Sequence, residues 1–113
     1  MRQIIMELKI QKELEIIKET ILKTVPTEAI YLFGSYVNGS PNQESDLDIY
    51  VVIPDTVKTH PLDVGVAIRK NLRNKKSMAV DLLVGTSSVF NRRKRSLTLE
   101  NTIAEEGLMI FGY

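Results

Sequence analysis

Apolar residues recur in the first quarter of the chain at the three- and four-residue spacing of one helical face. The repeating positions are Ile10, Leu14, Ile17 and Ile21. Glutamate and lysine residues fill the opposite side, as in a helix that packs one face and exposes the other. Pro26 cannot continue the hydrogen-bond ladder of a helix. The pattern therefore predicts an amphipathic helix over residues 2–24.

Further along the chain, short apolar runs bounded by glycine, proline and polar residues predict strands. These runs cover residues 29–33, 46–53, 78–84 and 108–111. Helical periodicity predicts a further helix at about 62–72. We also expect a short helix through Phe90 and another at about 97–106, which ends at Gly107. Gly85–Ser88 has the composition of a turn that leads into a helix. Helix and strand thus alternate along most of the sequence.

This alternation is typical of an α/β (α+β) fold, in which a small mixed sheet is flanked by helices. The chain has 113 residues, which is enough for one such domain, and we expect that domain to span residues 1–113. Its 43% hydrophobic and 26% charged residues are those of an ordinary globular protein rather than of a disordered chain.

Charge and cysteine content narrow the function classes. Fifteen basic and fourteen acidic residues give a formal net charge of +1, which does not support long-range capture of DNA or RNA. The absence of cysteine excludes disulfides and thiolate zinc sites. No signal peptide or membrane-spanning apolar run is visible, so we expect a cytoplasmic protein without a membrane partner.

Two aspartates stand at the start of the second predicted strand. Side chains alternate between the two faces of a strand, so Asp46 and Asp48 are expected to point the same way. Two carboxylates on one face repel each other and resist burial unless a positive charge joins them. A divalent cation is the simplest candidate for that charge.

Three other motifs that handle phosphates or metals fit this stretch less well. The run from Gly34 to Ser40 has the glycine spacing of a phosphate loop, but Ser40 stands where that loop needs a lysine. In phosphatases of the haloacid dehalogenase type the Asp-x-Asp pair follows its apolar strand, whereas Asp46 and Asp48 precede theirs. Glycosyltransferases carry Asp-x-Asp on much larger folds.

One pattern accounts for the whole stretch. Gly34-Ser35 is followed by ten residues and then by Asp46 and Asp48, and a third acid, Asp81, lies within a later apolar run. This arrangement resembles the nucleotidyltransferases of the DNA polymerase-β-like superfamily, and the short chain resembles their small members, the minimal nucleotidyltransferases. The resemblance covers residues 28–84 and implies that superfamily's core, a small mixed sheet flanked by helices.

The resemblance also implies roles for these residues. Asp46, Asp48 and Asp81 would be the catalytic residues and would hold two Mg²⁺ ions, which favour carboxylate and phosphate oxygens. Asp81 is also the candidate base for the attacking hydroxyl. Gly34 and Ser35 would bind the nucleotide, because Gly34 lets the backbone approach a triphosphate and Ser35 offers hydroxyl and amide hydrogens.

Structural roles are open for some of the same residues. Asp81 also fits a salt-bridge partner, and Ser35 also fits a helix cap. Small members of the superfamily often carry an arginine where this chain has Asn38, which can donate hydrogen bonds but brings no charge. The cluster Arg92–Arg95 fits either a solvated turn or a surface for a polyanion or an acidic partner.

The expected function is the Mg²⁺-dependent transfer of a nucleoside monophosphate, AMP from ATP, to a hydroxyl of another protein. The resemblance to minimal nucleotidyltransferases implies the partner as well, because many of them are antitoxins that modify a small helical HEPN-domain toxin on a tyrosine. We therefore expect a hetero-oligomer with such a toxin and no nucleic-acid partner. The alternative is a non-catalytic antitoxin that neutralises its partner by occlusion.

Overall fold

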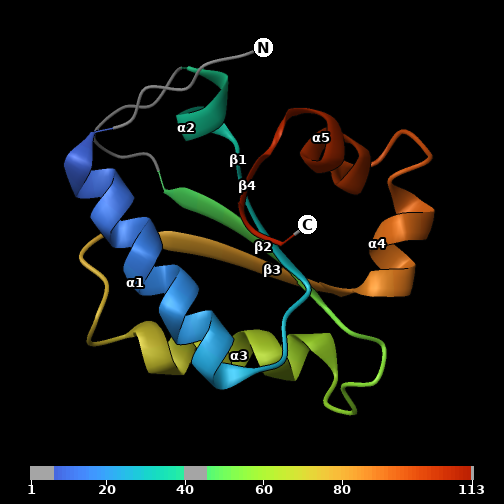
Figure 1. Ribbon diagram of the computed structural model, residues 1–113, viewed down its shortest axis with the longest axis horizontal. Helices are drawn as coiled ribbons and strands as arrows, with labels where there is room; N and C mark the ends of the chain where they lie inside the picture. Colours follow the sequence, from blue (N-terminus) through green and yellow to red (C-terminus); the bar gives the residue numbers. More distant parts are fainter. Residues whose placement is uncertain (1–6, 40–45, 113) are drawn as a thin grey trace.

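A computed structural model describes residues 7–39 and 46–112, which fold around one four-stranded sheet (Figure 1). The elements in chain order are α1 (Leu8–Thr24), β1 (Ala29–Phe33), α2 (Ser35–Asn38), β2 (Leu47–Ile53), α3 (Pro61–Leu72), β3 (Val80–Thr86), α4 (Ser87–Arg93), α5 (Leu99–Glu106) and β4 (Leu108–Phe111). The predicted α/β class with a small mixed sheet flanked by helices is confirmed. Within the described ranges no helix is both long and apolar enough to cross a membrane.

The sheet has the order β3-β2-β1-β4 and is mixed. β1 runs antiparallel to both β2 and β4, whereas β2 and β3 are parallel. Parallel neighbours need a crossover connection, and α3 lies in the segment that joins β2 to β3. This crossover places the starts of β2 and β3 at the same end of the sheet.

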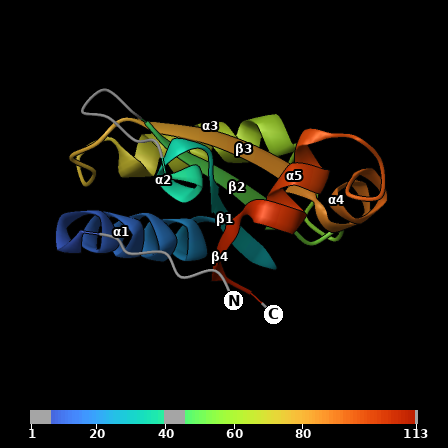
Figure 2. The ribbon, with the colours of Figure 1, turned by 90° about the horizontal axis from the view of Figure 1, so that it is seen from above.

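Helices α1 and α3 cover one face of the sheet, which we call the α1/α3 face (Figure 2). Every second residue of β2 points into this layer and is fully buried, namely Leu47, Ile49, Val51 and Ile53. The apolar stripe of α1 meets them with Ile10, Leu14, Ile17 and Ile21, as its spacing predicts. The main core of the protein therefore lies between this face and the two helices.

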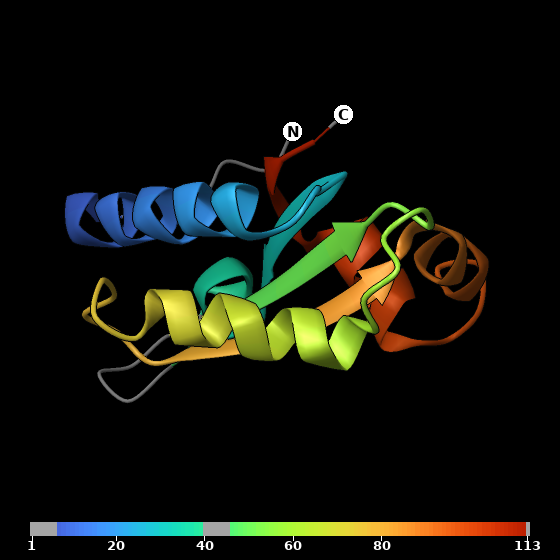
Figure 3. The same cartoon turned by 90° about the horizontal axis from the view of Figure 1, so that it is seen from below.

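Helices α4 and α5 lie on the opposite side of the strands, on what we call the α4/α5 face (Figure 3). A smaller apolar cluster packs there, made of Ala29, Tyr50, Val52, Phe90 and Ile103. Along β2 on this face, Tyr50 and Val52 are buried but Asp48 is only half-buried. The helices therefore cover the far part of the face and leave the start of β2 and β3 accessible.

Strands β1 and β4 have the predicted bounds, but other elements differ from expectation. α1 begins at Leu8, and residues 2–6 of the predicted helix lie outside the described residues, as do residues 40–45. β2 begins at Leu47, so Asp46 precedes the strand rather than opening it. The last long helix begins at Leu99 rather than Leu97, because the side chain of Thr98 accepts a hydrogen bond from the amide of Asn101 and caps the helix.

The predicted turn at Gly85–Ser88 is wrong. β3 runs on through Gly85 and Thr86, and Ser87 and Ser88 already belong to α4. Gly85 serves a close approach instead of a turn, since a side chain there would collide with the hydroxyl of Tyr50. The amide of Ser88 is capped from elsewhere, by the carboxylate of Asp55 at 3.0 Å.

Candidate active site

The chain leaves β1 through Gly34, which has φ +79° and ψ −151°. This region of backbone space is essentially restricted to glycine. A Cβ at this position would also collide with the Oδ2 atom of Asp48. The Asp48 carboxylate therefore lies directly against the backbone of Gly34, and the glycine is needed both for its conformation and for its lack of a side chain.

Ser35 opens the short helix α2, as predicted, but it does not cap it. Gly34 holds the capping position, and its carbonyl accepts the amides of Val37 and Asn38 at 3.0 Å each. Ser35 is half-buried, and Asn38 is exposed at the last residue of the helix. The structural alternative for Ser35, a helix cap, is therefore wrong, and its assignment to nucleotide binding stays a prediction.

The parallel pairing of β2 with β3 sets Asp48 opposite Asp81 in register. Paired residues of neighbouring strands lie on the same face of a sheet, here the α4/α5 face. Asp48 is also paired with Phe33 of β1, one residue before Gly34. Three separate segments thus meet at this end of the sheet, with Asp46 directly before β2.

Asp48 lies within electrostatic range of both other aspartates. Partial burial raises the pKa of the Asp48 carboxyl, and the negative charges of Asp81 and then Asp46 raise this pKa further. The ion pairs formed by the described side chains are Lys18–Glu15 and Arg93–Glu100, so neither involves these acids. The cluster is therefore an uncompensated concentration of negative charge.

The donor set of this cluster fits Mg²⁺. In the described part of the chain, no three histidine, cysteine, aspartate or glutamate side chains are already arranged around a common ion position. Mg²⁺ is commonly held by only one or two carboxylates, with water and substrate phosphates completing its octahedron. Hard oxygen donors that repel one another are suited to such an ion, and the structure offers no competing lysine or arginine partner among the described residues.

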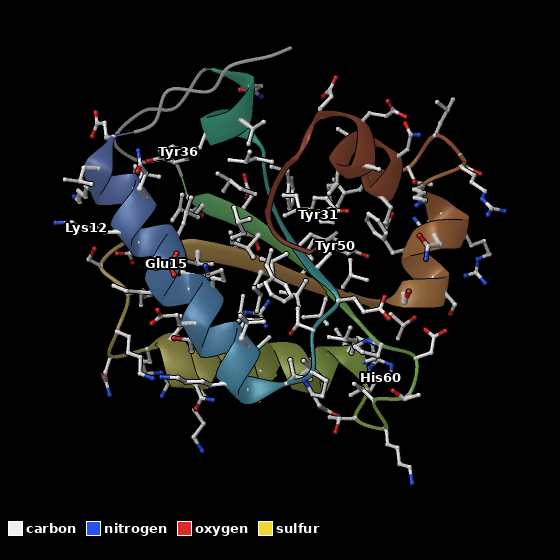
Figure 4. All side chains as sticks on the ribbon, in the orientation of Figure 1. Lys12, Glu15, Tyr31, Tyr36, Tyr50 and His60 are labelled. Carbon is white, nitrogen blue, oxygen red and sulfur yellow. The ribbon has the colours of Figure 1, made fainter. Side chains whose placement is uncertain are left out.

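A polar network borders the acid cluster on the same face. The hydroxyl of Tyr50 donates to Glu100 Oε2 at 3.1 Å, and Arg93 Nε donates to Glu100 Oε1 at 3.0 Å. Burial raises the pKa of Tyr50, and the adjacent Glu100 carboxylate raises it further. Tyr31 and Tyr50 lie close together beside α5 (Figure 4), and both rings contact Phe90. Tyr50 is therefore a neutral hydrogen-bond donor that anchors α5 to the sheet.

Burial alone would raise the pKa of Glu100, but hydrogen bonds from Arg93, its own amide and Tyr50, together with the charge of Arg93, lower it below the usual range. Sequence reasoning missed this residue. The available signal was position, since Glu100 stands three residues before the fully buried Ile103 on the same helix.

The basic cluster Arg92–Arg95 is not simply a solvated turn. Its first two residues complete α4, and Arg93 is held by Glu100. Lys94 lies 5.9 Å from the centre of the Phe90 ring, within the range of a cation–π contact. Two members of the cluster therefore have structural contacts, while Arg92 and Arg95 are exposed.

Comparison with known proteins gives three results. A family model described as a nucleotidyltransferase domain matches residues 14–107. No curated protein matches the sequence significantly. Several solved structures do match, and a proposed nucleotidyltransferase from Sulfolobus solfataricus superposes with a TM-score of 0.59 at 17% identity, covering 96% of this chain and 90% of that one.

Two toxin–antitoxin structures are also similar. A mutant of the MntA-HpeT toxin–antitoxin matches with a TM-score of 0.59 at 25% identity, covering 89% of this chain and 73% of that one. A toxin–antitoxin with AMP-PNP matches with a TM-score of 0.55 at 24% identity, covering 88% and 73%. The fold of the described residues is therefore shared with all three proteins.

Proposed function

The chain belongs to the nucleotidyltransferase domain family, and from that premise we propose that it transfers AMP from ATP to a hydroxyl of another protein in a Mg²⁺-dependent reaction. The predicted membership of a nucleotidyltransferase family is confirmed. The observation that carries the proposal is the register of Asp48 with Asp81 beside Gly34, with Asp46 close enough to add to the raised pKa of Asp48.

In this proposal each residue of the site has a distinct role. Asp46, Asp48 and Asp81 would hold Mg²⁺, which when bound neutralises the negative charge of the triphosphate and aligns it. Gly34 leaves its backbone open to a phosphate, and Ser35 supplies a hydroxyl donor beside it. These groups lower the barrier by positioning the reactants and by offsetting charge, which is most of what nucleotidyl transfer requires of a protein.

Asp81 is the candidate base for the acceptor. It is exposed on β3, an edge strand of the sheet, so a hydroxyl from another molecule can reach it. The acceptor oxygen attacks the α-phosphorus of ATP and forms a phosphodiester bond, pyrophosphate leaves, and the hydroxyl proton passes to the Asp81 carboxylate. The accessible half of the α4/α5 face leaves room for this approach.

The partner in the proposal is a toxin of the HEPN type, bound in a hetero-oligomer. Its support is the likeness to the MntA-HpeT toxin–antitoxin and to a toxin–antitoxin with AMP-PNP. Asp46 and Asp81 are also exposed, so a second protein can reach the acids of the candidate site. We therefore propose a cytoplasmic antitoxin whose acceptor surface is supplied by the toxin.

The experiment uses ATP labelled at either the α- or the γ-phosphate. The protein is incubated with Mg²⁺ and with the product of the adjacent gene. Nucleotidyl transfer moves the α-label and not the γ-label to the partner protein, whereas phosphoryl transfer does the reverse. Titration with AMP-PNP, in Mg²⁺ and then in EDTA, reports metal-dependent nucleotide binding without any acceptor. Absence of α-label on a partner that binds the protein would refute the proposal.

Asn38 favours one alternative, an antitoxin that occludes its toxin without chemistry, because this position brings no positive charge to the nucleotide. The double variant Asp46→Asn with Asp48→Asn separates the two mechanisms. Under the catalytic proposal this variant binds the toxin and fails to neutralise it. Under occlusion it neutralises the toxin as well as the unaltered protein does.

A further inference from the structure

A second glutamate is buried in this molecule, on the apolar stripe of α1. Glu13 is 4% exposed, although its charged neighbours on the helix, Lys12 and Glu15, are exposed (Figure 4). It stands three residues after Ile10 and four before Ile17, on the side that packs against the sheet layer. A carboxylate in this position is costly unless hydrogen-bond donors surround it.

Three donors do surround it, and all come from the segment that leads into β3. Glu13 Oε1 accepts the amides of Ser77 at 2.6 Å and Met78 at 3.3 Å, and Oε2 accepts the Ser77 hydroxyl at 2.8 Å. The nearest of these partners is 64 residues away along the chain. Glu13 therefore ties α1 to a distant loop instead of capping its own helix.

The segment that Glu13 holds is where the two acid-bearing strands first meet. The carbonyl of Ala79, directly after Met78, accepts the amide of Leu47 at 3.0 Å. The ladder continues with Leu47 opposite Val80 and then Asp48 opposite Asp81. The residue that Glu13 holds, Met78, is directly followed by the one whose carbonyl makes the first hydrogen bond of this register.

We propose that Glu13 is a positioning residue for the candidate active site, which fixes the spacing of Asp48 and Asp81 by holding Ser77 and Met78 at the start of β3. Removal of the carboxylate leaves two successive amides and a hydroxyl without their acceptor, and water replaces it at an exposed loop. The segment then samples other conformations, and the first hydrogen bond between β2 and β3 opens more often.

The test compares amide hydrogen exchange at the two ends of β2. Glu13→Leu removes the acceptor and suits the apolar stripe, so the core keeps its packing. We expect exchange of the Leu47 amide to rise roughly tenfold relative to that of the Ile53 amide in the same molecule. Glu13→Gln keeps one oxygen acceptor and returns the ratio of the two rates to within about threefold of its original value.

Thr20→Val is the matched control on the same helix. Thr20 is 3% exposed, and its hydroxyl donates only to the Ile16 carbonyl of its own helix. This variant disturbs α1 without touching Ser77 or Met78, so the ratio of the Leu47 and Ile53 rates stays unchanged. If Glu13→Leu does not fold, Ser77→Ala, which removes one donor, carries the same comparison with a smaller rise.

The expected effect of Glu13 on catalysis rests on the proposed function, so AMP transfer is measured separately from amide exchange. For AMP transfer we expect Glu13→Leu to lower kcat about tenfold and to leave KM for ATP within about twofold, since Gly34 and Ser35 are not held by this contact. An unchanged ratio of amide rates overturns the role of Glu13 even if transfer is active. A raised ratio in a protein that transfers no label supports that role and removes the proposed function instead.

Discussion

On the α1/α3 face of the sheet, the side chains of β2 are buried from its first residue to its last. On the α4/α5 face, burial begins only at Tyr50, and the half-buried Asp48 and exposed Asp81 lie beyond the cover of the helices. The first face can therefore carry most of the stability of the protein. The second face is less covered, and its carboxylates repel one another; in the proposed function a bound cation would offset that repulsion.

Asp48→Asn, on the α4/α5 face, is expected to have the largest effect, and that effect is on activity. This substitution removes a carboxylate that would hold Mg²⁺, and we expect the rate of AMP transfer to fall at least about 10³-fold, or about 4 kcal/mol in barrier height. Asp63→Asn, at an exposed acid in the first turn of α3, is the control and retains the rate of the unaltered protein. A transfer assay on both variants makes the comparison, and an active Asp48→Asn protein would remove Asp48 from the mechanism.

The same substitution is expected to stabilise the fold. The pKa of Asp48 is raised in the folded protein, so folding disfavours the charged carboxylate. Below the ordinary range of an aspartate, this carboxyl is protonated whether the chain is folded or not, and Asp48→Asn has little effect through charge. As the pH rises through the folded-state pKa, the unaltered protein loses stability that the variant keeps. Denaturant unfolding of both proteins across this range measures the difference in unfolding free energy. A gain of the variant over the unaltered protein that is smaller at neutral than at acidic pH would contradict this expectation.

Ile17→Ala tests how much the packing on the α1/α3 face contributes to stability. Ile17 is fully buried between α1 and the sheet, and we expect the truncation to lower the free energy of unfolding by about 3.5 kcal/mol. Leu83→Ala, at a 39% exposed position of the α4/α5 face, is the counterpart and is expected to cost about 1 kcal/mol. Urea unfolding measures both values. Similar losses for the two variants would show that stability is shared between the faces.

Gly34→Ala tests the point where backbone and acid cluster touch. The substitution combines an unfavourable backbone conformation with a collision against the Asp48 carboxylate, and we expect a loss of about 2.5 kcal/mol in unfolding free energy. Gly39→Ala separates the two causes, because Gly39 also has a positive φ, of +89°, but no atom of the described residues lies within 4 Å of its added Cβ. We expect it to lose only about 1 kcal/mol. Equal losses would mean that the contact with Asp48 is easily relieved.

Glu100→Gln is expected to have the smallest effect, on the covered half of the α4/α5 face. It weakens the contacts with Arg93 and Tyr50, and we expect the free energy of unfolding at neutral pH to fall by about 1 kcal/mol. This value is small because Arg93 is partly exposed to solvent. The folded-state pKa of Glu100 is lowered, so its contribution is present above the ordinary glutamate range and is lost as the pH falls through the folded-state value. Glu15→Gln, which removes an exposed ion pair with Lys18, is the control and is close to neutral at every pH. A loss for Glu100→Gln that persists in acid would contradict the charge-based explanation.

Elements that depend on local pattern were predictable from the sequence. The strands at residues 29–33 and 108–111 have their expected bounds, because apolar runs flanked by polar residues and glycine leave little choice. The helical stripe of α1 also packs as its spacing predicts. A shared site for Asp81 and Asp48 was expected from the resemblance alone, and the register that sets them opposite each other was not predicted, because periodicity does not say which strands become neighbours.

Features that depend on a single distant contact were not predictable. Gly85 suggested a turn, yet its lack of a side chain makes room for Tyr50, which is 35 residues earlier in the chain. In the sequence Glu13 is one of many charged residues on a helix, and only the fold brings Ser77 and Met78 to it. An acid at core spacing was the signal in both Glu13 and Glu100, but the sequence does not show which donors will meet such an acid.

The pairing of two aspartates in neighbouring parallel strands also disfavours a one-residue shift in their register. If β3 slipped by one residue against β2, its side chains would exchange faces and Asp81 would enter the apolar layer beneath α1 and α3. A buried, unpaired carboxylate is costly enough to reject that arrangement while the chain folds. A one-residue shift of the pairing is therefore disfavoured independently of the length of the segment that joins the two strands.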